Sequence, residues 1–306
     1  MPEIDVPLIL ARWLHFASLM IVFGASLFHL CALPTRLRDV SLRAPAATHR
    51  IVGAAGYLAL GSGLGWAARS LVVMAGGLSS LFDWDTLAGF FIGTSFGPIW
   101  LVRIALLVLI LLAAAMPMDK AGKVRHALLA CLAGGALSSQ AWLGHAAMAS
   151  GARLALELAS YITHVLAAGA WIGGLVPLAE LLAGRGLGRD GSGISGYRAI
   201  LLRFSNLGMN LVLLILATGL ANGAFRLRSA HDLLAADYGY AILAKGLLFS
   251  LMLIVAAVNR WRLMPRIEGE TEPALDDLRR NILVELALAV LVLGVAAILG
   301  TLPPRA

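Results

Sequence analysis

The sequence predicts an all-α fold: a polytopic integral membrane protein with one embedded domain, residues 1–306, built as a bundle of eight transmembrane helices. Hydrophobic residues make up 60% of the 306 positions and charged residues only 13%, which is too little charge to cover a water-soluble domain. Apolar stretches of about 20 residues, the length that crosses roughly 30 Å of hydrocarbon, recur along the chain. Lys and Arg gather in every second connection between these stretches. We therefore expect no soluble domain.

The predicted spans are, in order, residues 8–33, 51–76, 98–116, 126–149, 154–182, 204–225, 240–261 and 282–302. Proline marks three of their ends, because Pro34 follows the first span and Pro98 and Pro117 bracket the third. Residues 77–97 have the composition of turns, and residues 267–281 that of a polar loop with at most a short helical piece. No pair of spans repeats clearly enough to indicate an inverted repeat.

The distribution of Lys and Arg predicts the orientation. The connections after the first, third, fifth and seventh spans hold most of these residues, whereas residues 77–97 hold none. Basic connections stay in the cytoplasm, so both termini are predicted to be periplasmic and the location to be the cell inner membrane. The net charge of +7 thus belongs to loops between spans, and we expect the lipid bilayer, not nucleic acid, as the partner. The oligomeric state stays open.

Three histidines are predicted to lie in the outer half of the membrane, within about 10 Å of one another in depth: His15, His145 and His164. An imidazole in hydrocarbon usually faces the bundle interior, where it either holds helices together or binds a metal such as copper, zinc or iron. Met148 shares a helix face with His145 and would suit Cu(I), although ordinary packing is the plainer interpretation. Glu157, about two turns above His164, would attract cations or form an ion pair.

A second group of candidate ligands is predicted at the inner depth of the membrane. It comprises His29, Cys31, His126 and Cys131. A soft-metal exit site is one interpretation, and small core residues with a histidine at the headgroups is the other. The two cysteines are too few for a disulfide framework.

Small residues predict close helix packing at two places. Gly169 and Gly173 in the fifth span have the G-x-x-x-G spacing, as do Gly61 and Gly65 in the second. Such spacing lets two helix backbones approach each other closely.

Cationic side chains inside predicted spans include Arg69, Arg103 and Lys245. Because Arg103 and Lys245 are near outer ends, we expect them to reach the membrane surface or to pair with Asp83, Asp85 or Asp237, and we expect the same of Arg69.

Motifs of soluble catalysis are absent from the sequence. There is no G-x-x-x-x-G-K-[ST] phosphate loop, no G-x-S-x-G and no H-E-x-x-H. We therefore expect no enzyme activity and no transport driven by ATP within this chain.

Seven segments together resemble the CopD family of copper-resistance inner-membrane proteins. The segments are residues 12–29, 93–103, 144–147, 163–175, 238–249, 259–266 and 285–304. The hairpin with "GHAA" and "THVLAAGAWIGGL" is the most recognisable of them. The segments occur in the family's order and extend over nearly the whole chain. Each one alone is a weak signal, but together they are specific for the family.

The resemblance implies a protein that accepts copper at the periplasmic face, with a small CopC-like copper-binding partner, and moves it across the inner membrane. Carried over to this chain, it implies that His15, His145 and His164 are copper ligands. Two alternatives stay open. Histidines on facing transmembrane helices can also ligate haem b in a redox protein, and a non-transporting chaperone could hold copper at the outer face.

Overall fold

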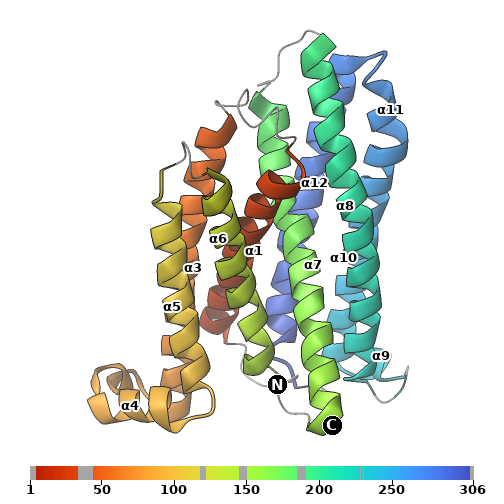
Figure 1. Ribbon diagram of the computed structural model, residues 1–306. Coiled ribbons are helices and arrows are strands. Elements are labelled where there is room, and N and C mark those ends of the chain that lie inside the picture. The colour runs from red at the N-terminus through yellow and green to blue at the C-terminus, as the bar shows by residue number, and fades with distance from the viewer. Residues whose placement is uncertain are drawn as a thin grey trace.

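The computed structural model describes residues 5–33, 44–117, 122–144, 150–184, 191–227, 229 and 231–303. Every regular element in these ranges is a helix. The long helices are α1 (Val6–Cys31), α3 (Ala44–Ala75), α5 (Gly97–Ala114), α6 (Gly122–Ser138), α7 (Gly151–Gly184), α8 (Gly191–Ala224), α10 (Asp237–Val258) and α12 (Thr271–Leu299). Shorter pieces are η1 (Leu78–Phe82), α4 (Trp84–Gly93), η2 (Ser139–Leu143), α9 (Asp232–Ala235), η4 (Asn259–Leu263) and α11 (Met264–Arg266). The all-α prediction is confirmed for this part of the chain (Figure 1).

Seven helices in the described ranges are long and apolar enough to cross a membrane: α1, α3, α5, α7, α8, α10 continuing through α11, and α12. The predicted span 126–149 corresponds to α6, which has 17 residues, and the 3₁₀ turn η2. Its last residues lie outside the described ranges, so eight spans stay a prediction. The first helix begins and the last helix ends at the same end of the bundle (Figure 1). We call this the outer end; its periplasmic location also stays a prediction.

Local signals in the sequence set where α1 and α5 begin. Asp5 caps α1 by accepting a hydrogen bond from the Leu8 N–H at 3.1 Å, and Pro7 occupies the first turn. Pro98 occupies the first turn of α5. A proline costs nothing there, because the first N–H groups of a helix have no partner within the helix.

The prediction of turns for residues 77–97 is wrong over Trp84–Gly93, which form the α-helix α4. Asp83 caps it by accepting hydrogen bonds from the backbone N–H and the hydroxyl of Thr86. These bonds favour the carboxylate and lower the pKa of Asp83. Phe90 anchors the helix, because it is buried in a cluster with Trp66 and Trp100.

The predicted polar loop 267–281 is also wrong over most of its length, because α12 begins at Thr271. Ala274, Leu278 and Ile282 recur every four residues and are buried. This stripe packs the first turns of α12 against the bundle, although the opposite face is charged.

The seventh span changes its winding near the inner end. Pro265 lacks an N–H, and its ring would collide with the carbonyl four residues earlier in a regular helix. The five residues of η4 just before it form a π-helical turn, which accommodates the proline without ending the span.

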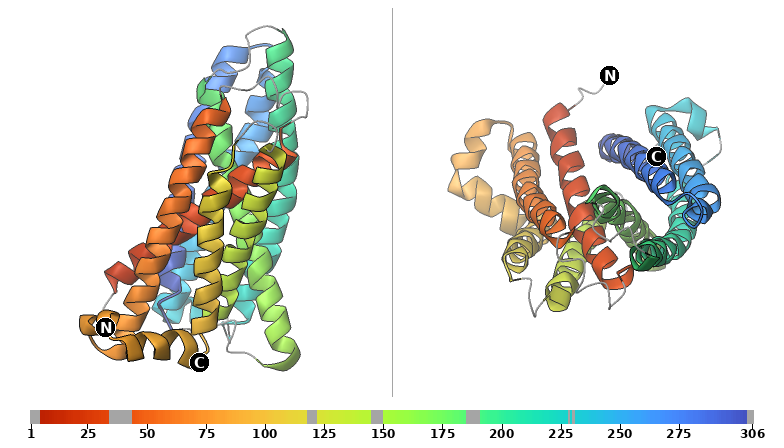
Figure 2. Two further views of the ribbon diagram at one scale, coloured as in Figure 1. Left: turned by 60° about the vertical axis from the view of Figure 1, so that its left-hand side comes forward. Right: turned by 90° about the horizontal axis from the view of Figure 1, so that it is seen from above.

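Helix α1 runs obliquely through the bundle and contacts α3, α6, α7 and α12 (Figure 2). It crosses α7 where Gly24 meets Gly173, and a Cβ on either glycine would overlap backbone atoms of the other helix. The predicted close packing is therefore confirmed for the fifth span. It is wrong for the second, because a Cβ on Gly61 or Gly65 would meet nothing within 4 Å.

Candidate functional site

His15 is fully buried between α1, α3 and α5. Its Nδ1 lies 2.9 Å from the Ala59 carbonyl oxygen on α3, and its Nε2 lies 2.5 Å from Nη2 of Arg103 on α5. A guanidinium can only donate, so Nε2 must accept this bond and Nδ1 must carry the proton that goes to Ala59. His15 is thus a neutral imidazole in a defined tautomer, with its lone pair directed at a cation.

Arg103 is fully buried within its span. The prediction that it reaches the membrane surface is therefore wrong. Its Nη1 donates to the Ala136 carbonyl at 3.0 Å and to the Ser139 hydroxyl at 2.7 Å. Its Cζ also lies 5.4 Å from the ring centroid of each of two tryptophans, Trp66 and Trp100. In the described ranges no carboxylate forms an ion pair with it. Aromatic faces, carbonyls and the imidazole therefore stabilise its charge in place of the predicted aspartates.

His164 is held in the same manner between α7, α8 and α10. Its Nδ1 lies 3.0 Å from the Thr218 hydroxyl, which itself donates to the Leu214 carbonyl and so accepts from the imidazole. Its Nε2 lies 3.3 Å from Nζ of Lys245, which can only donate. Lys245 therefore partners a histidine, where an aspartate or the membrane surface was expected.

Only two of the four predicted copper ligands, His15 and His164, lie in the residues that the structure describes. His145 and Met148 lie outside the described residues. His15 contacts α3 and α5, whereas His164 contacts α8 and α10. Among the residues whose positions are given, no three His, Cys, Asp or Glu side chains are grouped as metal ligands would be. Convergence of the predicted ligands on one ion stays a prediction.

Glu157 lies at the outer mouth and is almost completely buried. Arg153 Nε lies 2.8 Å from its Oε1, and Arg226 Nη2 lies 2.8 Å from its Oε2. Two arginines thus compensate one carboxylate, so in this arrangement Glu157 ties α7 to the end of α8 and leaves no uncompensated negative charge for a cation.

The inner group brings two of its four members together. The rings of His29 and His126 are stacked, with centroids 4.2 Å apart and planes inclined by 9°. Nitrogen lone pairs lie in the ring plane, so stacked faces do not direct both rings at one ion. Cys31 and Cys131 are exposed thiols on the surface of the bundle.

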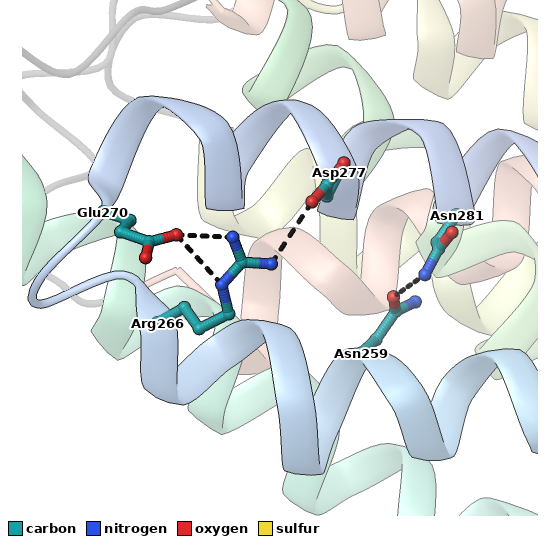
Figure 3. Close-up of polar contacts among 5 residues, drawn as sticks. All are labelled: Asn259, Arg266, Glu270, Asp277 and Asn281. Atoms are coloured by element: carbon teal, nitrogen blue, oxygen red, sulfur yellow. Dashed lines mark hydrogen bonds and ion pairs between the residues drawn. The ribbon is translucent and has the colours of Figure 1, made fainter.

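An apolar cavity of about 350 Å³ lies between α7, α8, α10 and α12 toward the inner end. Glu285 and Asn259 are among its polar lining residues, and Glu285 accepts from Asn259 Nδ2 at 2.6 Å. Figure 3 shows the neighbouring contact, in which Asn281 Nδ2 donates to Asn259 Oδ1 at 2.8 Å. Farther along, Arg266 pairs with Glu270 at 2.5 Å. These contacts join the inner ends of α10 and α12 beside the cavity.

Sequence reasoning missed the two cations as partners of the histidines. The available signal was a single charged residue inside an apolar span, which is rare and usually has a partner in the bundle. The partner of such a charged residue depends on how the helices pack against one another. The spacing of residues along the chain does not predict this packing.

Comparison with known proteins identifies relatives that align with nearly the full length of this chain. Residues 1–156 match the family described as copper resistance protein D-like, N-terminal domain, and residues 198–299 match copper resistance protein D. The copper resistance protein D of Pseudomonas syringae pv. tomato is 31% identical, over 97% of this chain and 96% of that protein. The inner membrane protein YebZ of Escherichia coli (strain K12) is 28% identical, over 96% of this chain and 97% of that protein.

The copper transport protein CutJ of Bacillus subtilis (strain 168) is 28% identical over 95% of this chain, which spans 52% of that longer protein. No solved structure matches the chain significantly. The seven apolar helices and these relatives together identify the chain as a multi-pass inner membrane protein.

Proposed function

Because the chain belongs to the copper resistance protein D family, we propose that it accepts copper at the periplasmic face and moves it across the inner membrane. Copper is then the cargo, and buried imidazoles in the outer half of the bundle are its ligands. The proposed set is the predicted one, His15, His145 and His164, with Met148 assisting if the ion is Cu(I).

The observation that carries the proposal is how the two described imidazoles are held. A histidine that binds a metal usually donates its other ring N–H to a carbonyl or similar acceptor, which defines the tautomer and aims the free nitrogen. His15 donates from Nδ1 to the Ala59 carbonyl, and His164 donates from Nδ1 to the Thr218 hydroxyl. In each, Nε2 is therefore the unprotonated nitrogen that would bind copper, and in the structure its lone pair accepts from Arg103 or Lys245.

The decisive experiment is metal analysis of purified protein. We compare wild type with the double variant His145→Ala plus His164→Ala, after loading with copper and removal of excess metal. His231→Ala is the matched control, because this histidine is exposed at the start of α9. A copper content that falls in the double variant and not in the control supports the site. Unchanged copper content in the double variant refutes it.

Two further measurements separate the alternatives. Copper accumulation in cells with and without the gene distinguishes transport from a chaperone, because a chaperone leaves total accumulation unchanged. An orange-red protein with a Soret band would identify haem b instead. The described geometry offers haem little support, because His15 and His164 direct their Nε2 atoms at cations on different helices.

We also propose delivery by a small periplasmic copper-binding protein of the CopC kind, which rests on family membership alone. Purified partner loaded with copper should transfer its metal to wild-type protein in detergent. It should transfer less copper to the variant His145→Ala plus His164→Ala.

A further inference from the structure

The long helices fall into two sets of four in chain order, α1–α3–α5–α6 and α7–α8–α10–α12. The second helices of these two halves carry similar local sequences, identical at four of eight positions. Residues 58–65 of α3 read LALGSGLG, and residues 214–221 of α8 read LILATGLA. Ser62 donates to the carbonyl of the residue four positions earlier, and so does Thr218. The next residue is glycine in both helices, and each glycine faces a histidine: Gly63 faces His15 and Gly219 faces His164. Equivalent residues thus make equivalent contacts.

The third helices agree in the same way. Gly97 opens α5 and Gly239 lies near the start of α10, and a Cβ on either would overlap backbone of the short helix just before, α4 or α9. The cation that faces the histidine follows six residues later in each case, as Arg103 and Lys245.

The first helices meet each other at equivalent positions. Gly24 and Gly173 each follow their histidine by nine residues. A Cβ on Gly24 would overlap the Gly169 carbonyl, and a Cβ on Gly173 would overlap the Met20 carbonyl. Gly169 and Met20 are themselves equivalent, each five residues after its histidine. Reciprocal contact of this kind is the signature of a two-fold axis.

From these three correspondences we propose that the chain is two copies of one four-helix unit, α1–α3–α5–α6 and α7–α8–α10–α12, and that each copy holds its own copper site. The inference rests on the proposed function. Four helices return the chain to the side where it started, so the copies have the same orientation and the axis runs along the membrane normal through the α1–α7 crossing. His15 and His164 are then equivalent ligands of two separate ions.

In each proposed site a cationic side chain occupies the nitrogen that would bind copper. The Nε2 lone pair of His15 accepts from Arg103, and that of His164 accepts from Lys245. Copper can bind this lone pair only after the cation withdraws, because one lone pair cannot serve both. Two positive charges a few ångströms apart in a poorly polarisable interior also repel each other strongly. Copper entry is therefore an exchange of one cation for another at a neutral imidazole.

The test is the copper stoichiometry and affinity of purified full-length protein, titrated with Cu(I) against a competing chelator. We expect two ions in wild type, one in His15→Ala, one in His164→Ala and none in His15→Ala plus His164→Ala. Arg103→Met and Lys245→Met remove the closing cation, so each should tighten copper binding at its own site about 10- to 100-fold, the reach of one charge-assisted hydrogen bond. His231→Ala is the control and should equal wild type.

The outcomes separate this inference from the proposed function. One ion in wild type, lost from either single histidine variant, overturns the two sites and leaves copper binding intact. No copper in wild type overturns both proposals. Two ions that persist in His15→Ala plus His164→Ala overturn the ligand assignment. Unchanged copper affinity in both methionine variants overturns the exchange. Should an alanine variant fail to fold, His15→Gln and His164→Gln keep a polar side chain that can donate to α3 or α8, and the same outcomes apply.

Discussion

The crossing of α1 and α7 provides the sharpest test of the packing. Gly173→Ala places a methyl group against the Met20 carbonyl, and Gly24→Ala places one against the Gly169 carbonyl. Neither backbone can move without separating the two helices. Overpacking of this kind costs about 1–3 kcal/mol, which exceeds the gain of roughly 0.5–1 kcal/mol from replacing glycine by alanine in a helix. Each variant should therefore unfold more readily than wild type.

The double variant makes the prediction specific. Because both methyl groups act on one crossing, the separation caused by the first makes room for the second. We expect the double variant to cost about as much as a single one, with an interaction free energy of roughly 1–2 kcal/mol between the two positions. The measurement is equilibrium unfolding in mixed micelles, followed by the fluorescence of the seven tryptophans.

The matched control lies on α3. Gly61→Ala adds the same methyl group in a helix where nothing lies within 4 Å. Helix propensity alone then acts, and the variant should be more stable by about 0.5–1 kcal/mol. Additive costs at Gly24 and Gly173, or a loss of stability at Gly61, would refute the reasoning.

Three further predictions concern ion pairs and orientation. Asp5 caps α1 and also forms an ion pair with Arg69 at 2.8 Å, and both side chains are partly exposed. Asp5→Ser keeps a capping oxygen but removes the pair, so it should lower the free energy of unfolding by only about 0.2–1 kcal/mol in the same assay. Asp5→Ala removes the cap as well and should lower it more. Glu157→Gln leaves two arginines around a nearly buried neutral group and should lower the free energy of unfolding by about 3 kcal/mol. Arg153→Ala removes a side chain that is 65% exposed and should lower it by less than about 1 kcal/mol. Equal losses in the two variants would contradict the burial of Glu157. A C-terminal alkaline phosphatase fusion should be active in cells, because the basic loops predict a periplasmic C-terminus, and an inactive fusion would reverse the orientation.

The sequence by itself determined the class of fold, because the lengths of apolar runs and the placement of prolines are local properties. Spans that end in a clear composition change were predicted within a few residues, as for α5. The starts of α8 and α12 were missed by 11 residues or more, because amphipathic turns beyond the membrane look polar when read along the chain. The family, too, could be identified from residues alone.

Only the tertiary structure decided what the buried polar residues do. Matched depth suggested that His15 and His164 share a site, but depth does not say which way a ring points around its helix. The packing of α3 and α5 gives His15 its partners, and that of α8 and α10 gives His164 its own. The repeat stayed hidden for a related reason: few residues match within each helix, and the connections between the helices differ in length. The matching residues are recognised as equivalent through the contacts they make in three dimensions.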